Sequence, residues 1–188
     1  TEEASRTRRQ SDLRSAISLR DVPSCVLAAR EMVTAATTAA NTRADELDAK
    51  EDEQFKAAFG IEEGSRIKGQ SKRNVDSAKK QLLAHQKTRR TRMIRDEADR
   101  SLVDLLGLFR DVLIVQVGSN LDLINQEMLP AIESFAARGN PADTTRTLEA
   151  IEHARASIQA HTPPQLAVES VMVSIKDPKL ASVHVNMR

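Results

Sequence analysis

The chain has no tryptophan or tyrosine and only four phenylalanines in 188 residues. Glycine and proline occur six times each, below their usual shares of about 7% and 5%. Strands favour aromatic and β-branched residues and need turn residues between them. These shortages argue against a sheet-rich fold. We predict an all-α helical bundle with a long antiparallel helical hairpin.

Cysteine and unbalanced charge are also scarce. Cys25 is the one cysteine, so no internal disulfide can form, and this usage suits a reducing cytoplasm. Twenty-eight basic and 27 acidic residues give a net charge of +1, which does not indicate a strongly basic nucleic-acid binder. The most apolar run, 102–117, contains three charged residues and is too short to span a bilayer. We expect a cytoplasmic location and no membrane contact.

Composition along the chain predicts four parts. Residues 1–21 are polar and arginine-rich, typical of an exposed helix or a linker from an upstream module, and the first residue is not methionine. Residues 22–95 form the hairpin, in which Val22, Val26, Ala29, Val33, Ala36 and Ala40 make one small-residue helix face. Residues 96–176 form the bundle core around a buried helix, followed by short helices, the first capped by Asn125. Residues 177–188 are a flexible tail.

The two arms of the hairpin carry opposite charge. Positions 43–63 hold eight acids and three bases, and positions 66–100 hold twelve bases and four acids. Such complementary charge favours antiparallel pairing. A turn near residue 64 or 65 would place Arg89 and Arg92 opposite Ala40 and Thr37, where no acid lies. We therefore expect Lys87, Arg89 and Arg90 to be exposed without a carboxylate partner. Together with Arg92, they are candidate contacts for a partner protein or a phosphate backbone. The alternative interpretation is a solvated face with local pairs such as Arg92 with Asp96.

No motif in the chain predicts catalysis, a cofactor or a metal. Gly64–Ser71 resembles a phosphate-binding loop, but Gln70 stands where that loop has lysine and no strand precedes it. None of the four histidines has an acid three residues before it, as di-iron bundles require. Cys25 fits a small buried residue better than a nucleophile.

Residues Arg95–Leu113 (RDEADRSLVDLLGLFRDVL) resemble the C-terminal domain of bacterial DNA polymerase III delta-prime subunits, in which a similar pattern begins the central helix of a helical collar. Asn125 stands where that family has an asparagine opening a short helix. Residues 151–175, with Arg155, Glu169 and Met172, are similar to its closing helices. The hairpin 43–92 is longer than in shorter family members, and His161-Thr162 stands where the family often has asparagine.

The resemblance implies a clamp-loader collar without activity of its own. The AAA+ module of the family, with its nucleotide, zinc and arginine-finger elements, would lie upstream. The collar would pack beside those of the delta and tau/gamma subunits, and would meet the sliding clamp and primed DNA only through the whole complex. We expect the contact face within 147–175, including Leu148, Ile151, Arg155 and Glu169. The alternatives are a hairpin protein that binds nucleic acid through its basic arm, and a helical-bundle enzyme or metal carrier.

Overall fold

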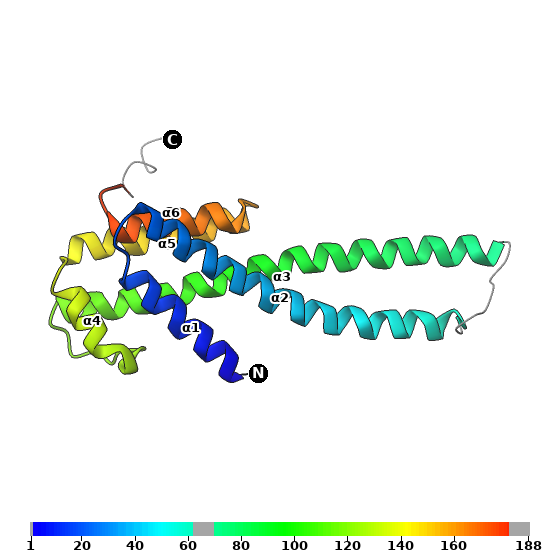
Figure 1. Cartoon of the computed structure of the whole chain (residues 1–188), viewed down its shortest axis with the longest axis horizontal. Helices are drawn as coiled ribbons and strands as arrows, with labels where there is room; N and C mark the ends of the chain where they lie inside the picture. Colours follow the sequence, from blue (N-terminus) through cyan, green and yellow to red (C-terminus); the bar gives the residue numbers. More distant parts are fainter. Residues whose placement is uncertain (1, 62–69, 181–188) are drawn as a thin grey trace. The chain divides into compact units, whose positions relative to one another are not determined.

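The computed structural model describes residues 2–61 and 70–180. It contains six α-helices and one 3-10 helix (Figure 1). They are α1 (Glu2–Ile17), α2 (Val22–Ala58), α3 (Gln70–Gln116), η1 (Gln126–Met128), α4 (Leu129–Ala136), α5 (Pro141–Gln159) and α6 (Pro164–Lys176). No strand occurs in the described ranges, so the prediction of an all-α fold is confirmed.

The chain divides into two compact units. The bundle unit comprises Thr1–Ala36 and Ala98–Arg188, and the hairpin unit comprises Thr37–Glu97. Helices α2 and α3 each contribute to both units. The expected hairpin began at residue 22, whereas residues 22–36 of α2 belong with the bundle unit because they bury Cys25, Ala29 and Met32 in its core.

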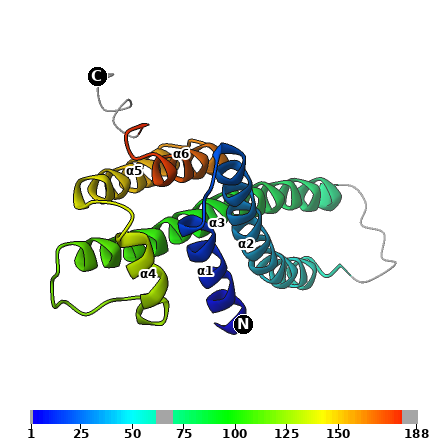
Figure 2. The same ribbon diagram turned by 60° about the vertical axis from the view of Figure 1, so that its left-hand side comes forward.

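The bundle unit is built around the second half of α3. Leu102, Leu105, Leu108, Phe109 and Val112 are almost fully buried there, and Phe109 meets Phe135 of α4 edge-on at 5.6 Å. Helices α5 and α6 lie side by side in both ribbon views (Figures 1 and 2). Val103 and Val117 are exposed, so a strip of this central helix remains open to solvent.

Two expectations about the bundle unit are corrected. Residues 1–21 are not simply exposed: Leu13 and Ala16 of α1 are fully buried in the core, because they lie three positions apart on one helix face. The small-residue face of α2 is confirmed from Ala29 onward, where Ala40 is also buried and Val33 packs against the core, but it does not extend to the start of the helix. Ala29 and Ala36 are buried, but Val22 and Val26 are 60% and 43% exposed.

Helix ends follow the capping residues of the sequence. The Ser24 amide donates to the Asp21 carboxylate at 2.8 Å, and Ser24 Oγ accepts from the Asp21 amide at 3.0 Å. Asp21 is therefore the N-cap of α2. Backbone and side-chain hydrogen bonds from Ser24 lower the pKa of Asp21. Asn140 likewise accepts from the Asp143 amide at the start of α5.

Three helices end in the same left-handed turn. Gly60, Gly118 and His161 have φ of 61°, 65° and 72°, and each is followed by an amide that bonds back five residues. Glycine is the usual residue there because it lacks a Cβ. His161 therefore bears backbone strain that the two glycines avoid.

In the hairpin unit the arms of α2 and α3 run antiparallel (Figure 1). Ala40 and Ala44 of α2 and Gln86 of α3 are buried, whereas Leu82 and Met93 are half-buried. The arms therefore share a narrow seam with little apolar area. Gly64 and Gly69, which the sequence places in the turn, lie outside the described residues.

Among the described residues, none of the helices combines the length and apolar character that crossing a membrane requires.

Candidate functional site

The expected unpaired bases of the hairpin are the first candidate, and the structure overturns two of them. Arg89 forms ion pairs with Asp48 and Glu51, and Arg90 pairs with Asp45 at 2.6 Å and with Asp48 at 2.7 Å. Arg90 also reaches Asn41 at 3.5 Å. The acidic arm therefore does neutralise both arginines, contrary to the sequence-based expectation.

The error lay in the register of the hairpin. Arg89 was placed opposite Ala40, but its partners Asp48 and Glu51 lie eight and eleven residues further along α2. The expectation took the register from the middle of the turn. The charged residues are a better guide, because antiparallel pairing is favoured where opposite charges meet.

These residues form a polar layer across the seam, which we define as Asp48, Glu51, Gln86, Arg89 and Arg90. Gln86 is buried and donates to Glu51 at 3.3 Å. The hydrogen bond from Arg89 lowers the pKa of Glu51. Burial acts to raise the pKa of Asp48, but hydrogen bonds from Arg90 and Arg89 outweigh it and the pKa is lowered. The layer's arginines are thus held by carboxylates that stay ionised near neutral pH.

Lys87 and Arg92 remain exposed. Lys87 has no ion pair within the described part of the chain, as expected. Arg92 pairs with Asp96 one turn later at 3.7 Å, with both side chains mostly in solvent, and such pairs stabilise a helix only slightly. A surface hollow of about 350 Å³ lies beside Arg92 and is lined by His85, Thr88 and Arg89.

The candidates on the closing helices have mixed positions. Ile151 is fully buried, so it cannot touch a partner in this fold, and its expected contact role is corrected to a core role. Leu148 is half-buried and packs on the core. Arg155 is held by Asp99 through two hydrogen bonds of 2.7 and 3.1 Å, and Glu169 accepts from Gln165 at 2.6 Å. Leu166 of α6, not singled out in the sequence, is 58% exposed.

The acids of the Arg95–Leu113 pattern have structural roles that periodicity did not reveal. Asp99 on α3 binds Arg155 of α5. Asp104, five residues later on α3, binds Arg9 of α1 at 3.0 Å. Asp111 holds the segment that leads to η1. Asp99, Asp104 and Asp111 therefore attach three other segments of the chain to the central helix.

Asp111 is the most enclosed of these acids. It is fully buried and accepts from the amides of Ile124 and Asn125 at 3.1 and 2.7 Å, and from the Asn125 side chain at 2.8 Å. Arg110 donates to it at 3.0 Å. The Asn125 side chain also accepts from Arg9. Asn125 was expected to cap the next helix, but its side chain makes no cap hydrogen bond because Asp111 and Arg9 engage it.

A second buried carboxyl belongs to Asp12 of α1. Asp12 is 8% exposed and accepts a long hydrogen bond from Ser101. Burial raises the pKa of Asp12 to about 6, although Arg8 and Ser101 oppose the shift. This group therefore titrates close to neutral pH.

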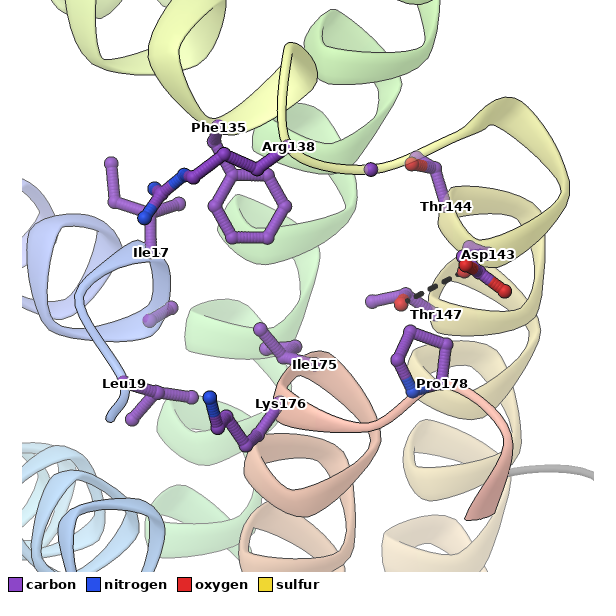
Figure 3. A pocket seen from close by; sticks show the side chains of 12 residues that line it. Ile17, Leu19, Phe135, Arg138, Asp143, Thr144, Thr147, Ile175, Lys176 and Pro178 are labelled. Carbon is purple, nitrogen blue, oxygen red and sulfur yellow. Dashed lines mark hydrogen bonds between the residues drawn. The ribbon is translucent and has the colours of Figure 1, made fainter. Parts of the chain in front are cut away.

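The bundle unit also has a cavity of about 280 Å³, shown in Figure 3. Its walls come from α1, α4, α5 and α6, and include Ile17, Phe135 and Ile175. Arg138 lies over the Phe135 ring at 5.6 Å, and Lys176 lines the opposite side. The hydroxyls of Thr144 and Thr147 are already used, toward Gln116 and the Asp143 carbonyl. The cavity thus resembles a packing defect more than a prepared polar site.

The described residues contain no group of three histidine, cysteine or acidic side chains placed to hold a metal. Cys25 is fully buried, as predicted, and burial raises the pKa of its thiol. A buried, protonated thiol is a poor nucleophile.

Residues 91–177 match the family model described as DNA polymerase III, delta subunit, C terminal. This part of the chain is therefore similar to the C-terminal domain of a clamp-loader subunit of DNA polymerase III. A search of curated proteins and a search of solved structures gave no match. The clamp-loader match spans the second half of α3 and everything to the end of α6, and it includes Asp99, Asp104 and Asp111. The acidic arm of the hairpin lies outside it.

Proposed function

We propose that this chain is the C-terminal collar domain of a delta-prime subunit. It would hold the clamp loader together by packing beside the collars of the delta and tau/gamma subunits. The match of residues 91–177 to the C-terminal domain of delta subunits carries the proposal. The resemblance of Arg95–Leu113 to delta-prime sequences supports the choice of delta-prime over delta.

The proposal extends to the whole protein. An AAA+ module would precede Thr1, and the sliding clamp and primed DNA would be reached only through the assembled complex in the cytoplasm. The role of the chain itself would be mechanical: apolar faces buried between subunits, with polar rims that fix their order. No bound cofactor is needed for this role.

We place the contact face on α6, around Leu166 and Glu169. Leu166 is 58% exposed, and a large apolar side chain in that position gains most from being covered by a neighbour. Glu169 is half-buried, and its one hydrogen bond within residues 2–61 and 70–180 is to Gln165 on its own helix, so it can contribute to a polar rim. Arg155 is already bound to Asp99, which makes it a positioning residue for α5.

The test is co-elution of this chain with delta and tau/gamma collars on a sizing column, with mass measured by light scattering. We expect a complex containing one copy of this chain. Leu166→Glu should dissociate it, whereas Leu121→Glu, at a residue 62% exposed on the loop after α3, should leave it intact. A wild-type chain that stays separate from both collars would overturn the proposed function. A complex lost in Leu121→Glu and retained in Leu166→Glu would move the contact face.

A further inference from the structure

One face of α3 in the hairpin unit carries a row of bases that the fold leaves unused. We define the basic row as Arg73, Lys80 and Lys87. All three are exposed, and none has an ion pair within the described residues. They are seven residues apart, so successive members differ by only about 20° around the helix. The row therefore forms a nearly straight line along α3.

The geometry of the row follows from helix dimensions. Seven residues at 1.5 Å each separate neighbouring bases by about 10.5 Å, and the whole row spans about 21 Å. Across the helix, the seam toward α2 contains Val75, Leu82 and Gln86. The row thus lies away from the acidic arm, and Asp76 is the one acid near it among the described residues of the α3 arm.

The polar layer explains why the basic row stays exposed and fixed in position. Arg89 and Arg90 are bound to Asp45, Asp48 and Glu51, so these three acids of α2 are already paired with bases outside the row. The layer also fixes α3 against α2, which keeps the row in position. What remains on the outer face is a row of three bases with one acid, Asp76, beside it on the same helix.

We propose that the basic row binds the phosphate backbone of duplex DNA. A duplex has one phosphate per strand every 3.4 Å, so a row of 21 Å matches about six base pairs. A regular polyanion suits evenly spaced point charges, because lysine contacts phosphate without needing a paired geometry. The Phe55 and Phe59 rings contact each other with centroids 4.7 Å apart and planes tilted by 42°, and they offer no open series of rings for unpaired bases. The proposal does not depend on the collar role.

The test is fluorescence anisotropy of the 188-residue chain with a labelled 20-base-pair duplex between 50 and 200 mM salt. Three phosphate contacts predict a slope of about −2.7 in the logarithmic plot, or about a 40-fold loss of affinity over that range. Arg73→Gln/Lys80→Gln/Lys87→Gln should remove most of this salt dependence. The matched control is Arg14→Gln/Arg20→Gln/Arg30→Gln, three exposed bases of the bundle unit. Circular dichroism checks that both triple variants stay helical.

Three outcomes would overturn the proposal. The first is no binding at 50 mM salt, and the second is an equal loss in both triple variants. The third is tighter binding to polyglutamate than to the duplex, at matched charge concentration, which would assign the row to an acidic protein. Success or failure in the collar co-elution leaves this result unaffected, so the two proposals are judged separately.

Discussion

Replacement of Asp111 by alanine tests the structural account of the bundle unit most directly. The carboxylate is fully buried and accepts both the amide and the side-chain donor of Asn125. Each buried donor left without an acceptor costs about 1–3 kcal/mol. Ile124 and Arg110 are more exposed and can turn to water, so we count the two Asn125 donors in full. The expected loss of unfolding free energy is about 3–4 kcal/mol.

Such a loss is large against the usual total of about 5–15 kcal/mol. Urea unfolding followed by circular dichroism should show a lower midpoint with an unchanged slope, and the melting temperature should fall by roughly 10 °C. The control is Asp122→Ala on the same loop. Asp122 is exposed, and Arg110 contacts its carbonyl rather than its side chain, so the change should stay within about 0.5 kcal/mol.

A double-mutant cycle with Asn125→Ala isolates the side-chain contact. The two single changes should not add, because the second removes a donor that the first has already orphaned. We expect a coupling of about 1–2 kcal/mol. A loss below about 1 kcal/mol for Asp111→Ala, or strict additivity with Asn125→Ala, would refute the claim that this carboxylate anchors the loop.

Three further predictions follow from single groups. Asp12 binds its proton more tightly in the folded state, so protonation of Asp12 stabilises the fold fully below about pH 4, and this stabilisation is lost as the pH rises through 6. Asp12→Asn should reduce the pH dependence of the unfolding free energy in denaturant titrations by about 1–2 kcal/mol. An unchanged pH profile would contradict this prediction. In the hairpin unit, the lowered pKa values of Asp48 and Glu51 give stability that is present above their unfolded pKa values and is lost as the pH falls below about 4. The wild-type chain should therefore lose helicity in acid, and Arg89→Met should make this loss smaller. A wild-type chain that is equally helical at pH 2 and 7 would count against the polar layer. At the end of α5, His161→Gly should keep or raise the melting temperature, because glycine adopts φ of 72° without strain. His161→Val should lower the free energy of unfolding by about 1–2 kcal/mol. Equal stability of both variants would show that the turn relaxes.

The sequence was a good guide wherever one residue or one local pattern decides the structure. Asp21 was recognisable as a cap because its side chain acts on an amide three residues later. Cys25 was recognisable as a core residue from its type and its isolation from histidine. The fold class followed from composition alone.

The parts that failed depend on distances that no local pattern encodes. The pairing of Arg89 with Asp48 and Glu51 required the register of two long arms, and an error of eight residues reversed the conclusion. Ile151 is apolar whether it faces the core or a neighbour, so periodicity could not separate the two. Asn125 had the chemistry of a cap, but a buried carboxylate fourteen residues earlier competed for it successfully.

The charged residues of the two units are used in different ways, and this difference indicates where function can vary. In the segment that matches the family model, Asp99, Asp104 and Asp111 each bind another segment of the bundle unit, so a change at any of them costs stability before it alters recognition. In the hairpin unit, the polar layer pairs Arg89 and Arg90 with carboxylates, whereas the basic row forms no ion pair within the described residues. Substitutions in the basic row should therefore change the free energy of unfolding very little, so natural selection on these residues can act through a binding partner alone. A surface of that kind can acquire a binding role without disturbing assembly, which is why we look for DNA binding on α3 and for packing against neighbouring collars on α6.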